Sequence, residues 1–287
     1  MSIKISQLFF SLQGEGKYVG QPSIFLRTFG CNFRCKGFGM LIGENTTEVT
    51  PIIEQHKEKP FTAIKDMPMV ATGCDTYYAI YPAFKNLATN MTTDEIVDKI
   101  ESLRCEAQPA GPVNGIKDTH IVITGGEPLL GWQKEYPALF DKLAETGYRN
   151  ITFETNGTQQ LSDELYNYIA LNDRQMNFTF SVSPKLGCSG ESSTKALKPE
   201  IVEEYSDVAE TYLKFVVADE FDLEEANGWV EQYKEAGFRG DKYIMPCGGE
   251  SELYQYNSAE VARLAIYYNY KFSPRLHVDI WNNDPEA

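Results

Sequence analysis

The stretch Gly30-Cys31-Asn32-Phe33-Arg34-Cys35, completed far along the chain by Gly73-Cys74-Asp75-Thr76, decides how this sequence folds and what it can bind. Its three cysteines have the spacing C-x3-C-x38-C. Thiolates are soft ligands, which suit zinc or an iron–sulfur cluster. Three cysteines are one short of the usual four. Without a fourth protein ligand, one iron of a [4Fe–4S] cluster is therefore left open to a small molecule.

Two plainer interpretations of these cysteines compete with a cluster. Free cysteines pack well in protein cores, so the three thiols could be unrelated buried side chains. Structural zinc is the other alternative, but it normally needs four ligands. The sequence has only three histidines, His56, His120 and His277, and His120 begins a predicted strand, at the wrong end for a site formed where strands end.

The composition is that of an ordinary globular chain, with 287 residues, 42% of them hydrophobic and 23% charged. A net charge of −15 repels phosphate backbones, so we expect no direct binding to nucleic acid. No apolar run approaches the roughly 20 residues that a membrane span needs, and the first residues lack the features of a signal peptide. We expect a cytoplasmic protein whose six cysteines are metal ligands or buried thiols, with Cys105 buried on a helix face.

Predicted strands and helices alternate along the chain, which indicates right-handed βαβ units and a parallel sheet. A capping box at Thr92–Glu95 begins the first helix of this series. The predicted strands cover residues 3–10, 23–29, 120–124, 150–154, 178–182, 212–218, 242–245 and 275–281, and the later helices cover 136–147, 162–171, 224–236 and 258–268.

Unusual residues follow the carboxyl ends of these strands: Cys31, Gly125-Gly126-Glu127, Asn156, Ser183-Pro184-Lys185 and Cys247. In parallel α/β barrels that end of the strands carries the active site. The order of elements therefore predicts an active site where these residues meet.

Five motifs, in order, resemble one family: Ser11-Leu12-Gln13-Gly14-Glu15-Gly16, Cys31–Cys35, Cys74-Asp75-Thr76, Ile123-Thr124-Gly125-Gly126-Glu127-Pro128 and Ser273-Pro274-Arg275-Leu276-His277-Val278. Together they are similar to the 7-carboxy-7-deazaguanine synthases of the radical S-adenosylmethionine (SAM) superfamily. The resemblance implies an α/β fold, a partial, open parallel β/α barrel. It covers nearly all of a single domain, residues 1–287, except residues 36–73, which it marks as an insertion in the cluster loop.

The same resemblance implies a [4Fe–4S] cluster on Cys31, Cys35 and Cys74, with SAM bound beside it. The SAM-binding residues it implies are Gly73, Asp75, Gly126, Glu127, Asn156, Ser183, Pro184 and Lys185. The plain alternatives are a Gly-Gly turn after a buried strand and a solvated strand-end lysine. Because Gly73 replaces an aromatic residue usual in the family, we expect Tyr77, Tyr78 or the insertion to rebuild the adenine pocket.

A substrate clamp is implied at Leu12, Gln13, Gly14, Glu15, Arg27 and Thr124. Arg27 lies in an otherwise apolar strand, where an unpaired guanidinium is costly, so it needs an anion. A substrate carboxylate fits its fork, and a salt bridge to Glu15 is the alternative. The resemblance makes Thr76 a ligand of Mg²⁺, for which a hydroxyl oxygen is suited. His277, in a predicted strand, is the weakest candidate.

The implied activity is a radical SAM carbon–nitrogen lyase of 7-deazapurine (queuosine- or archaeosine-type) biosynthesis. It would convert 6-carboxy-5,6,7,8-tetrahydropterin to 7-carboxy-7-deazaguanine with loss of ammonia. The resemblance also implies a flavodoxin- or ferredoxin-type reductant and a homodimer. The alternatives are a glycyl-radical activating enzyme, which shares the cluster but acts on a protein, and a non-catalytic module stabilised by zinc.

The inserted residues 36–73 contain apolar side chains, including Ile52, Ile53 and Phe61, so they are expected to be ordered. We expect a small subdomain, with a short hairpin or strand pair, that supplies no cluster ligand.

Overall fold

The computed structural model describes residues 2–111, 118–172 and 175–284. In these residues one sheet of nine strands has the order β3-β1-β2-β4-β5-β6-β7-β8-β9. The strands are β1 (Ser2–Leu12), β2 (Pro22–Thr28), β3 (Thr89–Thr92), β4 (His120–Gly125), β5 (Asn150–Thr155), β6 (Asn177–Val182), β7 (Glu210–Val217), β8 (Lys242–Pro246) and β9 (Lys271–Phe272). Neighbours from β2 through β9 are parallel, whereas β1 is antiparallel to β2 and β3.

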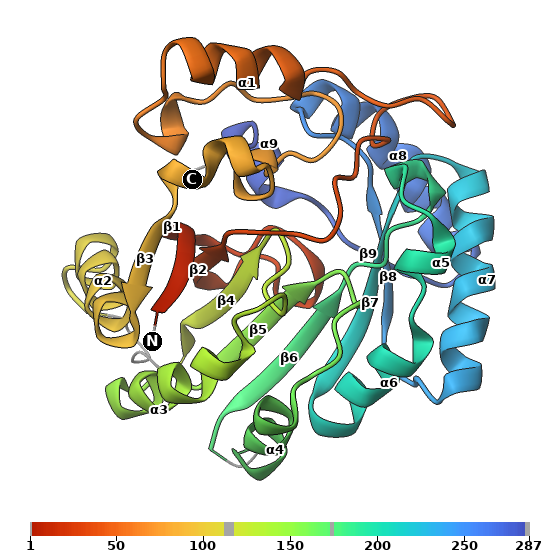
Figure 1. Cartoon of the computed structure of the whole chain (residues 1–287). Helices are drawn as coiled ribbons and strands as arrows, with labels where there is room; N and C mark the ends of the chain where they lie inside the picture. The colour runs from red at the N-terminus through yellow and green to blue at the C-terminus, as the bar shows by residue number, and fades with distance from the viewer. Residues whose placement is uncertain (1, 112–117, 173–174, 285–287) are drawn as a thin grey trace.

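Most of the helices lie around the outer side of this curved, open sheet, whereas α1 and α9 lie beyond one end of it (Figure 1). They are α1 (Val49–Glu58), α2 (Thr93–Ala107), α3 (Tyr136–Thr146), α4 (Asp163–Asn172), α5 (Ser193–Ala196), α6 (Pro199–Val208), α7 (Glu220–Ala236), α8 (Ser251–Tyr267) and α9 (Leu276–Trp281). The sheet ends at β3 and β9 without closing. The fold is therefore the partial, mostly parallel barrel that the sequence predicts.

Local signals in the sequence begin and end the helices as expected. Thr92 Oγ1 accepts from the backbone N–H of Glu95 while the Glu95 carboxylate accepts from that of Thr92, which completes the capping box of α2. Gly147 ends α3 in the left-handed region, at φ 103°, where a side chain would be strained. Helices α5 and α6 and strand β3 were not predicted from the sequence. Helix α8 begins at residue 251, seven residues before the predicted start at 258.

An aromatic layer fills the space between the sheet and its helices. Phe153 of β5 stacks on Phe180 of β6 with 5.2 Å between ring centroids, and Phe180 stacks on Tyr205 of α6 at 4.5 Å. These three side chains are fully buried. Burying one such side chain stabilises a fold by about 1.5–3 kcal/mol, so this layer holds the strands in the register that the cavity requires.

Residues 36–73 share a small core with residues 77–84, and the expected hairpin is wrong. Within this range, all of which the structure describes, no strand forms; the segment contains α1 and a short 3-10 helix, Ile64–Asp66. Val49, Ile52 and His56 recur at helical spacing and are buried on one side of α1. This periodicity of three to four residues, and not an alternation, is the pattern that should have decided the prediction.

The chain after β9 also departs from the prediction. Residues 275–281 were expected to form the last strand, but α9 begins at Leu276. Pro274 has no N–H for a strand ladder, so the chain leaves the sheet after Phe272. The alternation also fails in burial: Val278 is buried whereas Ile280 is 51% exposed.

Cys105 is exposed on α2, because the helix buries the face that carries Ile96, Val97 and Ile100. The expectation of a buried thiol is therefore wrong. No helix in the described residues is long and apolar enough to cross a membrane.

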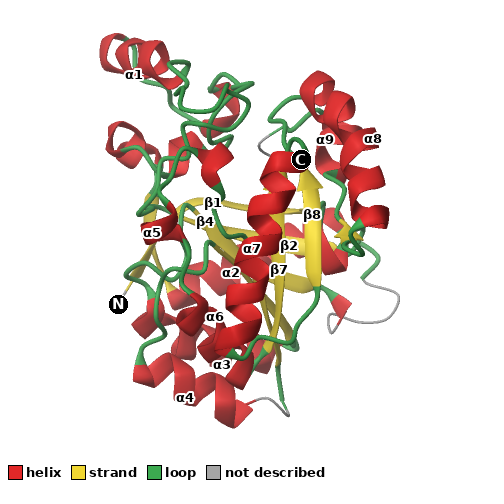
Figure 2. Cartoon of the chain, turned by 90° about the vertical axis from the view of Figure 1, so that its right-hand side faces the viewer, coloured by secondary structure: helices red, strands yellow, loops and turns green. Residues whose placement is uncertain are grey.

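Helix α1 and helix α9 lie beyond the carboxyl ends of the parallel strands (Figure 2), which places both at the end where the site residues gather.

Candidate active site

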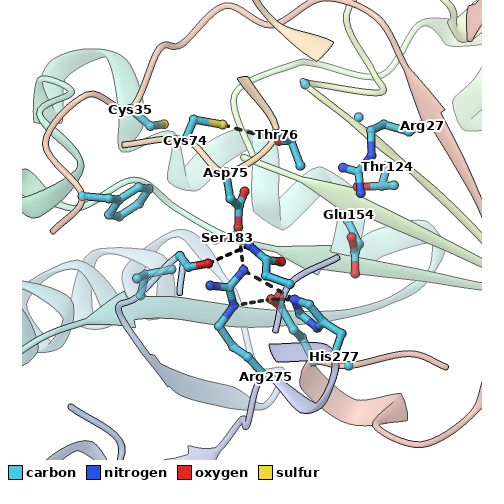
Figure 3. Close-up of a pocket in the computed structure, with 18 of the residues that line it drawn as sticks. Arg27, Cys35, Cys74, Asp75, Thr76, Thr124, Glu154, Ser183, Arg275 and His277 are labelled. Atoms are coloured by element: carbon cyan, nitrogen blue, oxygen red, sulfur yellow. Dashed lines mark hydrogen bonds and ion pairs between the residues drawn. The ribbon is translucent and has the colours of Figure 1, made fainter. Parts of the chain in front are cut away.

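One cavity of about 290 Å³ lies on the inner side of the sheet. Its wall includes the three cysteines of the predicted cluster loop, Cys31, Cys35 and Cys74. The close-up in Figure 3 shows Cys35 and Cys74 near one another on one side of the cavity, with Arg27 and Thr124 across from them. Folding thus brings together residues that are separated by most of the chain.

The three thiols are withdrawn from water. Burial raises the pKa of Cys31 to about 12, and it raises the pKa of Cys35 and of Cys74 as well. A thiol in such surroundings ionises when a cationic centre replaces the lost hydration. Cys31 Sγ also accepts from the backbone N–H of Phe33 at 3.3 Å, as a thiolate ligand can. The set therefore fits an iron–sulfur cluster, and each of the three cysteines is free of disulfide bonds.

Glycine is required where β4 meets the cluster loop. A Cβ atom on Gly126 would overlap the carbonyl of Gly30 and the side chain of Cys31. Glu127 N donates to Gly30 O at 2.8 Å, which fixes this close approach. The Gly-Gly pair is therefore more than a turn: it lets the strand end lie directly against the loop that carries the first cysteine.

The residues predicted to bind SAM divide into two groups. Six of them line the cavity: Gly73, Asp75, Gly126, Asn156, Ser183 and Lys185. Glu127 and Pro184 are absent from its wall. Glu127 is fully buried, and its carboxylate accepts from Thr155 Oγ1 at 2.7 Å and from the backbone N–H of Asn156 at 2.7 Å. In this structure Glu127 ties the end of β5 to the end of β4.

A polar layer crosses the inner face of the sheet. Arg27 of β2 is opposite Thr124 of β4, and Glu154 of β5 is opposite Ser181 of β6. All four line the cavity; Arg27 and Thr124 each follow an apolar run in their strand, whereas β5 and β6 alternate polar and apolar residues. Because inward-facing side chains alternate along a strand, equivalent positions on neighbouring strands form one layer.

Arg27 does not make the salt bridge to Glu15 that was considered as an alternative. Its Nε donates to Gln7 Oε1 at 3.1 Å, and within the described residues it makes no ion pair. Gln13 is held at both ends of its amide, donating to Glu154 Oε1 at 3.0 Å and accepting from the backbone N–H of Glu15 at 3.0 Å. Leu12 and Gly14 complete this part of the wall.

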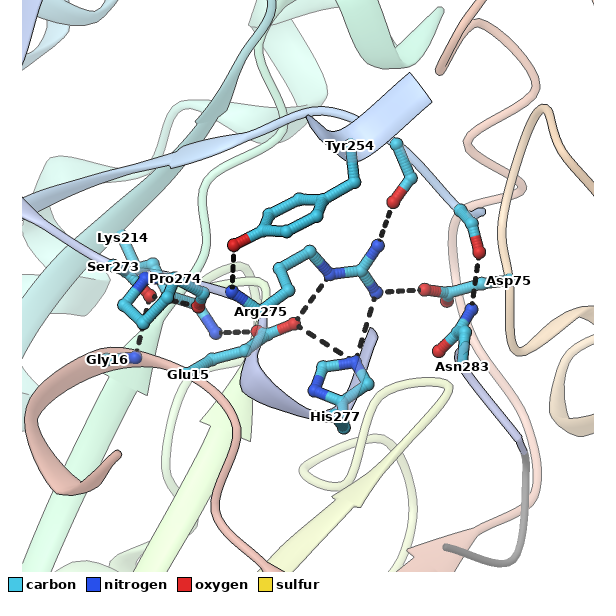
Figure 4. A network of polar contacts seen from close by, with 12 residues as sticks. Glu15, Gly16, Asp75, Lys214, Tyr254, Ser273, Pro274, Arg275, His277 and Asn283 are labelled. Atoms are coloured by element: carbon cyan, nitrogen blue, oxygen red, sulfur yellow. Dashed lines mark hydrogen bonds and ion pairs between the residues drawn. The ribbon is translucent and has the colours of Figure 1, made fainter. Parts of the chain in front are cut away.

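A network of buried charges forms the floor of the cavity (Figure 4). Glu15 accepts from Lys214 Nζ with one carboxylate oxygen and from Arg275 Nε, at 3.0 Å, with the other. Arg275 Nη2 also bonds to Asp75 at 2.5 Å. Burial alone would raise the pKa of Glu15, but the charges of Lys214 and Arg275 outweigh it and hold that pKa well below its usual range.

His277 lies at the edge of this network. Its Nε2 is 3.9 Å from Glu15 Oε1, and burial together with the charge of Arg275 lowers its pKa to about 4. The imidazole is therefore neutral near pH 7, so the close contact with Arg275 carries no repulsion. A Cβ atom on Gly14 would overlap this ring, so glycine lets the loop pass beneath it.

The sequence analysis missed Lys214, Arg275 and Glu154 as cavity residues. A detectable signal existed for Lys214, which is a charged residue inside a mostly apolar strand, as Arg27 is; Glu154 lies in a strand that alternates polar and apolar residues. Lys214 is only 4% exposed. Arg275 had no such signal, since its partners lie far away in the sequence and the helix that follows it was predicted as a strand.

Thr76 lines the cavity next to the cluster loop, with its Oγ1 3.4 Å from Cys74 Sγ. In the part of the chain that the structure describes, no three acidic, histidine or cysteine side chains are placed to hold a single metal ion. Asp75, the nearest carboxylate in sequence, is bound to Arg275, whose charge offsets its burial and lowers its pKa.

Residues 64–70 give the cavity an apolar wall. Ile64, Met67, Pro68, Met69 and Val70 all line it. Tyr78 also lines it and donates to Gln7 Oε1 at 2.9 Å, whereas Tyr77 is buried in the small core with Phe84. The segment 36–73 therefore contributes directly to the cavity.

Comparisons with known proteins agree on one family. No protein-family model matches the chain. The sequence is 30% identical to the 7-carboxy-7-deazaguanine synthase of Halobacterium salinarum, over 100% of this chain and 93% of the relative. It is 26% identical to the enzyme of that name from Pyrobaculum aerophilum, over 98% of this chain and 96% of the relative. A crystal structure of QueE from Escherichia coli has the same fold, with a TM-score of 0.55 at 18% identity, over 96% of this chain and 95% of that one.

Proposed function

The chain belongs to the 7-carboxy-7-deazaguanine synthase family, and we propose that it is an enzyme of this activity. It would convert 6-carboxy-5,6,7,8-tetrahydropterin to 7-carboxy-7-deazaguanine with loss of ammonia. The observation that carries the proposal is one cavity that joins three buried or half-buried thiols to a guanidinium without an ion-pair partner among the described residues. Neither a glycyl-radical activating enzyme nor a zinc-stabilised module has support in the comparisons.

Cys31, Cys35 and Cys74 would hold a [4Fe–4S] cluster whose fourth iron binds SAM. When bound, the cluster and SAM supply the radical that starts the rearrangement. The chain's part is placement. Lys185 Nζ donates to Ser183 O at 2.8 Å and to Ser183 Oγ at 2.9 Å, which orients that strand end toward the cavity. Gly125 and Gly126 line the cavity, and their backbone carbonyls would accept from the ammonium group of SAM.

The apolar wall of residues 64–70 would receive the adenine ring. The position before Cys74 is Gly73, and a Cβ there would overlap Thr46. No aromatic side chain is therefore available at this position, and Met67, Met69 and Val70 offer apolar surface instead. We assign residues 36–73, as an insertion in a single domain, this role in SAM binding.

The substrate would lie across the polar layer. Arg27 would bind the carboxylate, since a guanidinium fork matches a carboxylate in geometry and charge. Glu154, fixed by Gln13, and Thr124 would bond to the donors and acceptors of the pterin ring. Because Gln13 already has partners at both ends, it acts by orienting Glu154 and Glu15.

Thr76 would bind a Mg²⁺ ion held mainly by substrate and water. A hydroxyl at the mouth of the cluster loop is a suitable hard ligand, and Mg²⁺ usually keeps several ligands that the protein does not supply. A flavodoxin- or ferredoxin-type reductant and a homodimer are further parts of this proposal.

The direct test is anaerobic incubation of the reduced protein with SAM, Mg²⁺ and 6-carboxytetrahydropterin, followed by mass spectrometry. Formation of 7-carboxy-7-deazaguanine is the expected result. A protein with a full cluster that cleaves SAM but never forms this product would contradict the proposal.

Arg27→Ala tests the substrate assignment. The cluster content and SAM binding should stay at the wild-type level while turnover of the pterin is lost, because the change removes the carboxylate contact and a bond to Gln7 but no group at the cluster loop. Arg149→Ala is the control, since Arg149 bonds to backbone carbonyls at the opposite end of the strands. Equal turnover in the two variants would remove Arg27 from the substrate site.

Thr76→Ala should weaken the Mg²⁺ dependence of the same reaction.

A further inference from the structure

We propose that Glu191 is a positioning residue for the cluster: its carboxylate fixes the backbone at Cys35, and its negative charge lowers the reduction potential of the cluster. This inference rests on the proposed function, because it assumes a cluster on the three cysteines. Glu191 lies in the connection between β6 and α5, far from the cluster loop in sequence and outside every motif that the sequence analysis identified.

Two bonds carry the inference. Glu191 Oε1 accepts from the backbone N–H of Arg34 at 2.8 Å and from that of Cys35 at 2.9 Å. Cys35 has φ 48°, in the left-handed region, where a residue with a side chain is strained. Successive backbone N–H groups next to a left-handed residue form an anion-binding nest. The carboxylate therefore stabilises the unusual conformation that directs Cys35 to the cavity.

The loop that carries Glu191 is itself fixed against the cluster loop. Gly37 N donates to Ser189 O at 2.9 Å, and a Cβ on Gly37 would overlap Gly190. Ser189 Oγ donates to Leu186 O at 2.6 Å and accepts from Glu191 N at 3.2 Å. The contact with Arg34 and Cys35 is thus held on both sides and is not a chance approach of a surface side chain.

A carboxylate also binds backbone N–H groups at the other end of residues 36–73. Glu48 accepts from the backbone N–H groups of Ala71, at 2.9 Å, and Thr72, at 3.0 Å, just before Cys74. Glu48 belongs to the segment itself, whereas Glu191 belongs to the barrel. Glu191 is therefore a residue of the barrel that binds the backbone at the second cysteine of the cluster loop.

The same bonds set the charge around the cluster. The potential of an iron–sulfur cluster depends on nearby charge and on hydrogen bonds to its sulfurs. The N–H groups of Arg34 and Cys35 are taken by a carboxylate and are not donated to sulfur. A negative charge beside Cys35 disfavours the added electron, so Glu191 makes the reduced cluster a stronger reductant.

Three variants test this inference: Glu191→Ala, Glu191→Gln and the control Glu225→Ala. Glu225 accepts from the backbone N–H of Gly187 at 2.8 Å in the same loop, but among the described residues it does not bond to the backbone at 34–35. The readouts are iron and sulfide per chain after anaerobic reconstitution, the rate of iron loss to a chelator, and the midpoint potential from a titration followed by electron paramagnetic resonance.

We expect Glu191→Ala to lose iron to the chelator several-fold faster than the wild type. Glu191→Gln, which keeps an acceptor oxygen but no charge, should keep its cluster and shift the midpoint potential in the positive direction. Glu225→Ala should match the wild type. The inference is overturned if both Glu191 variants keep the wild-type iron content, chelation rate and potential, or if Glu225→Ala reproduces their changes. A wild-type chain that takes up no iron and sulfide would instead overturn the proposed function, and this inference with it.

Discussion

The cavity floor and the cluster loop are held in place in opposite ways. In the floor, Arg275, Lys214, Glu15 and Asp75 bind one another side chain to side chain, and they come from parts of the chain that are about 200 residues apart. In the loop, the carboxylates of Glu48 and Glu191 bind backbone N–H groups. The main hydrophobic core contains side chains of the sheet and of the helices around it, whereas the small core is formed by residues 49–70 together with residues 77–84.

This difference decides how each region fails. Removing one partner of a buried ion pair leaves an unpaired charge and costs about 3–5 kcal/mol, which the whole fold must absorb. A hydrogen bond to a charged group contributes about 1.5–3 kcal/mol. A segment that packs mainly in the separate small core can loosen without unfolding the barrel. The floor should therefore respond globally to mutation, and the loop locally.

The largest expected effect is on the loop's ligand. Cys74→Ala should give little iron after anaerobic reconstitution and no SAM cleavage, because two thiolates cannot hold the cluster. Iron content and SAM cleavage are the measurements. Cys105→Ala, an exposed thiol on α2, should behave as the wild type. Full cluster loading in Cys74→Ala would show that Cys74 is not a cluster ligand. The comparison between the loop and the floor would then fail.

The next effect is on the floor. Arg275→Met should lower the free energy of unfolding by about 3–5 kcal/mol, because Glu15 and Asp75 would be buried without their shared partner. Urea denaturation of the cluster-free protein measures it. Arg263→Met is the matched control: Arg263 is exposed on α8 beside Glu260, and such pairs contribute about 0–1 kcal/mol. Equal losses in the two variants would show that the floor network does not stabilise the fold.

A smaller global effect is expected in the small core. Ile52→Ala removes a buried side chain of α1, a change that costs about 2–5 kcal/mol where it acts. We expect faster proteolysis and faster amide exchange within residues 36–73, with the main unfolding transition nearly unchanged. Ile100→Ala, at a fully buried position of α2, should instead shift the main transition. If both variants lowered only the main transition, the two cores would form one cooperative unit.

The smallest effect concerns pH. The pKa of His277 is about 4 in the folded chain, against 6.5 for the unperturbed group. Between these values the unfolded chain binds the extra proton, so stability is full above about pH 6.5 and falls as the pH drops toward 4. At pH 5 the loss of stability should be smaller in His277→Asn than in the wild type by on the order of 1 kcal/mol. At pH 8 the substitution should remove no such loss. Denaturation curves at both pH values, compared with the wild type, measure this difference.

A wild-type-like slope in His277→Asn would mean that the ring is already protonated in the folded chain. The floor network would then include a fifth charge, and the contact between His277 and Arg275 would be repulsive.

Much of the architecture could be predicted from local patterns. Apolar runs gave six parallel strands, from β2 to β8 apart from β3, and the capping box and terminal glycines gave several helices. The failures have local causes. The helical periodicity of Val49, Ile52 and His56 was overlooked. The alternation at residues 276–280 was given more weight than Pro274, which ends the strand.

The sequence by itself determined the candidate chemistry: which thiols are candidates for soft ligands, where glycine lets a strand end approach the loop, and that Arg27 is a candidate to bind an anion. Ligand types and motif spacing are local properties, so they can be seen in the sequence. Only the tertiary structure decided which charges meet. Arg275 joins Glu15 to Asp75, and Glu191 binds the backbone at Cys35, across long stretches of chain. Such pairings depend on strand register and loop paths, which the packing of the whole core fixes.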